Sequence, residues 1–142
     1  NGDGVIDDVA YDSNGDGMVD TVEMDADGDG IMDTKSMDTD GDGTLDTIGK
    51  DSNGDGVIDT FGSDMDGDGN LDTFSMDTNN NGVMDTLATD TNGDGMIDKV
   101  AFDTNGDGTF DAIKMDTNND GILDTTGVDV NYDGKIDTIF RG

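Results

Sequence analysis

Residues 38–50 have the sequence DTDGDGTLDTIGK, and this stretch decides the fold. Aspartates stand at its first, third, fifth and ninth positions, and a glycine stands at its sixth. Apolar residues, Leu45 and Ile48, stand at its eighth and eleventh positions. The same pattern returns every 13 residues on both sides of this stretch, so the chain is a tandem repeat.

We number the repeat positions from one to thirteen. Ten complete copies follow one another without a linker, and they begin at Asp12, Asp25, Asp38, Asp51, Asp64, Asp77, Asp90, Asp103, Asp116 and Asp129. An eleventh copy, residues 1–11, lacks its first two positions. The sequence therefore predicts a single array of eleven repeats over residues 1–142, with no separate functional domain.

The composition is strongly acidic and poor in apolar residues. Asp and Glu number 36, Lys and Arg number 6, the formal net charge is -30, and hydrophobic residues are 30%. Such a chain either stays disordered or folds around cations. Without Cys or His, it has no disulfides, no thiolate or imidazole metal ligands and no histidine catalysis. Six scattered cations argue against nucleic acid as a partner, and the short apolar runs argue against membrane insertion.

The acidic residues are concentrated at four repeat positions, which hold 34 of the 36. These positions supply the predicted metal ligands. Position one holds Asp12, Asp25, Asp38, Asp51, Asp64, Asp77, Asp90, Asp103, Asp116 and Asp129. Position three holds Asn1, Asn14, Asp27, Asp40, Asn53, Asp66, Asn79, Asn92, Asn105, Asn118 and Asn131. Position five holds Asp3, Asp16, Asp29, Asp42, Asp55, Asp68, Asn81, Asp94, Asp107, Asp120 and Asp133. Position nine holds Asp7, Asp20, Asp33, Asp46, Asp59, Asp72, Asp85, Asp98, Asp111, Asp124 and Asp137.

The spacing of these side chains indicates calcium. Alternate side chains on a tightly curved segment converge on one centre, and the glycine at position six permits the bend. Hard oxygen donors suit Ca²⁺ and not zinc or copper. One ion per copy adds 22 positive charges to the net charge of -30 and leaves -8, whereas two per copy leave +14. We therefore expect about one Ca²⁺ per repeat, roughly ten to eleven in total.

This pattern resembles the first part of the EF-hand calcium loop, but two features of that motif are missing. The glutamate that the EF-hand carries at position twelve is present only as Glu23. Only seven residues separate one loop from the next, too few for the flanking helices. We expect the missing ligand to come from an adjacent copy, with ions shared at copy boundaries.

The chain also resembles the type 3 repeats of thrombospondins, which carry tandem D-x-[DN]-x-D-G-x-x-D loops. Matching residues include Asp25, Asp27, Asp29, Gly30 and Asp33, and the match extends over essentially every copy. The cysteines of that family are absent, and the spacing here is uniform. The chain is similar in principle to the RTX β-rolls of secreted bacterial proteins, although their nonapeptide is absent. The resemblance implies an extracellular calcium-binding array without enzymatic activity.

The apolar residues recur as regularly as the acidic ones. Position eight is apolar in all copies, and position eleven is apolar except at Lys35 and Thr126. Stacked copies would align both positions into a thin core, and their β-propensity favours short strands. We predict an all-β, partly irregular, calcium-stabilised tandem-repeat solenoid, an elongated rod with essentially no helix. One copy per coil gives a rod of about 50 Å, and two copies per coil halve it. Because the core is so thin, calcium must contribute to the folding free energy.

The leading functional hypothesis is an extracellular calcium-binding structural protein, secreted or at the cell surface. It would serve as a rigid stalk, adhesin segment, matrix component or filament, with self-association into fibres. The alternative is a calcium-dependent binding module for a surface, mineral, carbohydrate or ice. The threonines at position ten would suit ice, although such rows are more often β ladders. We expect no enzyme, because the same carboxylates recur in every copy and catalysis needs one distinctive pocket.

Overall fold

The computed structural model describes residues 4 and 6–142, and every regular element in them is a four-residue β-strand. The strands are β1 (Asp8–Tyr11), β2 (Thr21–Met24), β3 (Thr34–Met37), β4 (Thr47–Lys50), β5 (Thr60–Ser63), β6 (Thr73–Met76), β7 (Thr86–Thr89), β8 (Lys99–Phe102), β9 (Ala112–Met115), β10 (Thr125–Val128) and β11 (Thr138–Arg141). Each strand occupies repeat positions ten to thirteen. The described residues include no helix that could cross a membrane.

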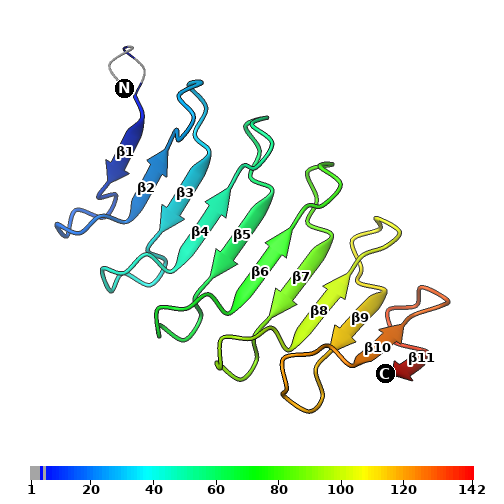
Figure 1. Ribbon diagram of the computed structural model, residues 1–142. Coiled ribbons are helices and arrows are strands. Elements are labelled where there is room, and N and C mark those ends of the chain that lie inside the picture. Colours follow the sequence, from blue (N-terminus) through cyan, green and yellow to red (C-terminus); the bar gives the residue numbers. More distant parts are fainter. Residues whose placement is uncertain (1–3, 5) are drawn as a thin grey trace. The chain divides into compact units, whose positions relative to one another are not determined.

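The chain divides into two compact units, residues 1–71 and 72–142. In the first unit β1 to β5 pair antiparallel in chain order. In the second unit β6 to β11 do the same. Figure 1 shows the strands of each unit side by side with a loop at every reversal. One register holds throughout: position ten lies opposite thirteen, as in Thr34 and Lys50, and position eleven lies opposite twelve.

Each loop spans positions one to nine and returns the chain alongside the strand that it has just left. A backbone hydrogen bond closes the base of the loop: the N–H of Asp33 donates to the C=O of Met24 at 2.8 Å. The same bond joins Asp98 to Thr89 at 2.9 Å. Successive loops therefore lie at opposite edges of the sheet (Figure 1).

The predicted all-β repeat architecture with short strands is confirmed, but the path within each unit is a meander and not the stacked coils of a solenoid. Stacked coils would set identical repeat positions side by side in parallel strands. Parallel neighbours need a crossover of about a dozen residues or more. Here the loop closes on itself through the Asp33–Met24 bond and its equivalents, so the next strand runs antiparallel. Two copies bring the chain back to the same edge.

The register explains why position twelve is mostly small. Residues that lie opposite each other project from the same face of the sheet. Bulky residues at position eleven therefore lie opposite position twelve of a neighbouring strand, as Phe61 lies opposite Gly49 and Leu87 opposite Ala101. Position twelve belongs to a strand and not to the loop, so it does not supply the loop ligand that the EF-hand takes from its glutamate.

Gly127 shows how little space remains at position twelve. A Cβ atom placed on Gly127 would lie 2.9 Å from Cγ1 of Ile113 and 2.9 Å from Cγ2 of Ile136. We expect Gly127→Val to lower the free energy of unfolding by about 1–3 kcal/mol through overpacking, measured by denaturation at saturating calcium. The added change Ile113→Ala should recover part of the loss, because it vacates the contested space. Equal losses in the single and double variants would contradict this packing.

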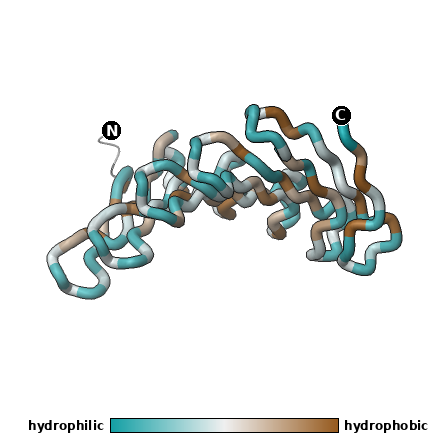
Figure 2. Tube along the Cα trace, turned by 90° about the horizontal axis from the view of Figure 1, so that it is seen from below, coloured by the Kyte–Doolittle hydropathy of each residue, from teal (hydrophilic) through white to brown (hydrophobic). Residues whose placement is uncertain are grey.

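The most deeply buried side chains are acidic. The only buried apolar residues in the described part of the chain are Ala88 and Ala101. Aspartates at positions one and nine are buried in much greater number: Asp20, Asp25, Asp46, Asp51, Asp59, Asp72, Asp77, Asp85, Asp98, Asp103, Asp111, Asp116 and Asp129. Figure 2 shows hydrophilic residues concentrated in the loops and hydrophobic residues recurring in the strands. The ordered structure of the loops at the sheet edges thus depends on hydrogen bonds or cations that compensate the buried carboxylates.

Candidate metal centres

The carboxylate at position one organises each loop. In Asp25, Oδ1 accepts the backbone N–H of Gly28 at 2.7 Å, and Oδ2 accepts that of Gly30 at 2.8 Å. The bond from position six to position one recurs in all ten complete copies. The loop backbone is thereby wrapped around one carboxylate.

Positive φ angles allow the tight curvature of the loop backbone. They occur at positions four and six, whereas the sequence predicted only position six. Gly30 at position six has φ of 94°, as the sequence predicts for the bend. Position four is also left-handed, and where it lacks glycine it holds Asn80, Asn119 and Tyr132 with φ of 56°, 58° and 59°. We did not identify position four from the sequence, although its preference for Gly and Asn was the available signal.

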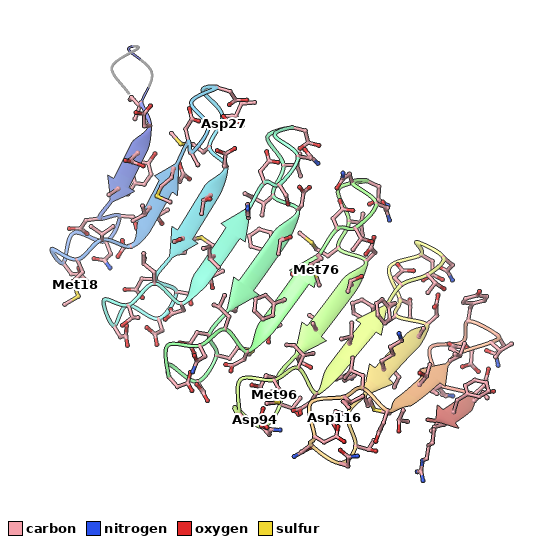
Figure 3. All side chains as sticks on the ribbon, in the orientation of Figure 1. Met18, Asp27, Met76, Asp94, Met96 and Asp116 are labelled. Atoms are coloured by element: carbon pink, nitrogen blue, oxygen red, sulfur yellow. The ribbon has the colours of Figure 1, made fainter. Side chains whose placement is uncertain are left out.

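The side chains at positions three and five continue the curve. Asp27 accepts the backbone N–H of Asp29 at 3.0 Å, and Asp29 accepts that of Ile31 at 2.8 Å. Each of these side chains bonds the amide two residues further on, so successive carboxylates turn toward the inside of the loop. Figure 3 shows Asp27 in the loop that joins β2 to β3.

The carboxylate at position nine anchors the start of the same loop. Asp46 Oδ2 accepts the backbone N–H of Thr39 at 2.8 Å and the Thr39 hydroxyl at 3.0 Å. Asp85 accepts the hydroxyl of Thr78 in the same way, at 2.8 Å. Sequence reasoning missed these hydroxyls at position two, whose signal was the frequent Ser or Thr there.

Three loops of the first unit bring carboxylate oxygens together as a possible metal site. The groups are Asp12 with Asp16 and Asp20, Asp25 with Asp27 and Asp29, and Asp38 with Asp40 and Asp42, each with oxygens within 4.8 Å of one another. Opposite ligands of Ca²⁺ are about 4.6–5.2 Å apart, so these oxygen sets fit that ion. Each group comes from one loop, and none includes the ligand expected from an adjacent copy.

Most of the other predicted ligands are not gathered so closely. Residues 72–142, all described, contain no internal group of three carboxylates at that spacing. Their copies carry asparagine at position three, for example Asn92 and Asn105, so an amide oxygen would have to complete the set. Asp33 and Asp46 are absent from the groups of their own loops. Asn1 and Asp3 lie outside the described residues.

Hydrogen bonds favour the ionised form of many loop carboxylates. The Ser13 hydroxyl lowers the pKa of Asp20, and the Thr39 backbone N–H lowers that of Asp46. At Asp51 burial is the largest single effect and raises the pKa, but the backbone N–H groups of the loop together outweigh it and the pKa is lowered. The same balance lowers the pKa of Asp90, Asp103, Asp116 and Asp129. The loops are therefore suited to present anionic oxygen to a cation.

The lowered pKa values predict unfolding in acid. The folded state binds these protons less tightly than the unfolded chain does, so the stability from these groups is complete above about pH 4. It is lost as the pH falls through the lowered pKa values of the folded state. Circular dichroism against pH, at constant calcium, should show a transition below about pH 4, and one above about pH 5 would contradict the prediction. Asp8→Asn, which changes an acid outside the loops, should leave the midpoint unchanged.

Comparisons with protein-family models, with curated proteins and with solved structures found no match for this chain. The fold and the loops therefore define its class by themselves. It is an all-β tandem-repeat protein whose recurring aspartate-rich loops could hold metal ions.

Proposed function

We propose that the chain is an extracellular calcium-binding structural repeat protein that forms part of a stalk, matrix or filament. One observation carries the proposal: a single loop geometry recurs along the chain, and in several copies its carboxylate oxygens converge within 4.8 Å. The resemblance to thrombospondin type 3 repeats and EF-hand loops supports calcium as the ion.

The charge and the donor set support calcium at about one ion per repeat. Every ligand offered by the four positions is a carboxylate or amide oxygen, which Ca²⁺ prefers. The net charge of -30 would oppose compaction unless it were largely neutralised. In the three groups, each oxygen set comes from one loop, which fits one ion per copy without ions shared between copies.

The repetition supports a structural role over a catalytic one. The same set of carboxylates occurs in each loop, so no single pocket is set apart by its chemistry. Extracellular calcium, near millimolar, saturates modules with a Kd of about 10⁻⁴–10⁻³ M, whereas cytosolic calcium does not. Folding that depends on calcium would therefore place the ordered protein outside the cell.

The test is the number of ions bound. Isothermal titration of the chelator-treated chain with Ca²⁺ should give roughly ten to eleven sites, with Mg²⁺ binding much more weakly because it requires a smaller octahedral shell. A total of only a few ions would limit binding to the convergent groups and contradict one ion per repeat. Absence of calcium binding would overturn the proposed function.

The alternative is a calcium-dependent binding module for a surface, mineral, carbohydrate or ice, and the strand pairing argues against ice. Antiparallel pairing alternates the face from which position ten projects. Thr47 lies on the face of Ser63, with their hydroxyl oxygens 3.4 Å apart, whereas Thr34 lies opposite Lys50 on the other face. The threonines therefore form no continuous row on one face, and a row is what matching to an ice surface would need.

A further inference from the structure

Loops at the same edge of a unit touch through position seven. The sulfur of Met96 would lie 2.8 Å from a Cβ placed on Gly121, which is position six of the loop two copies further on. The sulfur of Met18 would lie 2.9 Å from a Cβ placed on Gly43, in the same relation. Each methionine therefore packs directly against the bare backbone of a neighbouring loop.

The length of the side chain at position seven decides whether this contact forms. Cγ2 of Ile31 would lie 3.8 Å from a Cβ placed on Gly56, which is an ordinary van der Waals distance. Gly108 and Gly134 lie two copies after Val83 and Thr109, and a Cβ on either glycine would meet nothing within 4 Å. Among the described residues at position seven, only the long, unbranched methionines approach the neighbouring loop so closely.

The contacted glycines support the first ligand of their own loops. The N–H of Gly121 donates to Asp116 Oδ2 at 2.7 Å, and the N–H of Gly43 donates to Asp38 Oδ2 at 2.9 Å. Figure 3 shows Met96 beside the loop that carries Asp116. A change at the methionine thus acts one hydrogen bond away from a predicted calcium ligand.

Both methionines are open to solvent. Met18 is 49% exposed and Met96 is 53% exposed, so each side chain is accessible to a small oxidant. We propose that Met18 and Met96 are sites of reversible oxidation, at which a hydroperoxide separates neighbouring loops of one edge. The consequence for calcium affinity rests on the proposed function, whereas the loss of the contact does not.

The chemistry is a two-electron oxygen transfer. The thioether sulfur attacks the terminal oxygen of the hydroperoxide, the S–O bond forms as the O–O bond breaks, and the leaving oxygen takes a proton to become water or an alcohol. The sulfur is oxidised to the sulfoxide and the peroxide is reduced. The new oxygen requires solvation, and the glycine N–H beneath it is already donated to an aspartate. The sulfoxide therefore turns to solvent and the loop contact is lost.

The test uses the full chain, saturated with calcium and treated with hydrogen peroxide. Peptide mass mapping should show sulfoxide at Met18 and Met96, and the amide resonances of Gly43 and Gly121 should shift. The resonances of Gly108 and Gly134 should stay in place, because no side chain at position seven reaches them. The calcium affinity of the loops at 38–46 and 116–124 should fall about fourfold, which corresponds to the free energy of burying about one methylene group. Methionine sulfoxide reductase should restore both readouts.

The double variant Met18→Leu with Met96→Leu is the matched control. Leucine keeps an apolar side chain but forms no sulfoxide, and all other methionines remain oxidisable. Peroxide should then leave the resonances of Gly43 and Gly121 unchanged. Full oxidation of the original chain without shifts at these glycines, or the same shifts in the double variant, would overturn the proposal. If no calcium binds, the proposed function fails, and the glycine resonances of the folded chain still decide whether oxidation breaks the contact.

Discussion

Removal of calcium with EGTA is expected to abolish most of the β-sheet signal of this protein. The folded units bury almost no apolar side chains among the described residues, and the side chains that they do bury are mainly aspartates. Carboxylates about 4 Å apart repel by about 4 kcal/mol per pair at a surface-like dielectric constant. Without a cation, each convergent group, such as Asp25, Asp27 and Asp29, contributes several such repulsions.

Far-UV circular dichroism during chelation measures this effect. The signal should return when calcium is added in excess, because the disordered chain retains every ligand. Added sodium chloride at equal ionic strength is the control, because screening alone does not replace ligation. A spectrum that stays unchanged after exhaustive chelation would show that hydrogen bonds within the loops hold the fold without metal.

Asp25→Ala is expected to have the largest effect of any single loop substitution in the first unit. The change removes one of three convergent carboxylates and leaves the N–H groups of Gly28 and Gly30 without their acceptor. Hydrogen bonds to charged groups contribute about 1.5–3 kcal/mol each, so we expect the loss of two to lower the free energy of unfolding by about 3–6 kcal/mol. Calcium titration should also show one site fewer.

Asp27→Asn in the same loop is the matched control. Position three is asparagine in most copies, so the amide oxygen should retain both the ion and the bond from the Asp29 N–H. We expect full calcium stoichiometry and a small change in stability. If Asp25→Ala and Asp27→Asn behaved alike, position one would have no special role in organising the loop.

The repeat pattern was sufficient to predict the strands but not their direction. The apolar residues at positions eight and eleven predicted a short strand in every copy, and the strands include position eleven but not position eight. They recur identically in parallel and antiparallel arrangements, so periodicity could not distinguish a solenoid from a meander. The strand direction is decided by the hydrogen bond that closes each loop, such as the one from the Asp33 N–H to the Met24 C=O. Because this bond joins backbone atoms, the pattern of side chains in the sequence does not reveal it.

Pairing between strands also explains residues that looked exceptional in the sequence. Lys35 interrupts the apolar series at position eleven, and Glu23 is the one acid at position twelve. The register sets them opposite each other, and Lys35 Nζ lies 3.0 Å from Glu23 Oε1. The partner of Lys35 could not be identified before the direction of the strands was known.

The candidate metal site was predicted in part. The spacing of positions one, three and five anticipated the convergence of Asp38, Asp40 and Asp42. Position nine was predicted as an equal ligand, and in this loop Asp46 instead accepts hydrogen bonds from Thr39. The competition between a metal ion and a neighbouring hydroxyl for the same oxygen depends on geometry within the loop, and residue spacing does not encode it.

Because loops alternate between the two edges of a unit, the effect of deleting copies depends on whether an odd or an even number is removed. Deleting one copy from the first unit, residues 38–50, would send every later strand of that unit in the opposite direction and exchange the edges of its remaining loops. Deleting two adjacent copies, residues 38–63, would preserve direction, edge and face. A unit can therefore be lengthened or shortened in steps of 26 residues, twice the period visible in the sequence, without changing the direction, edge or face of its remaining copies.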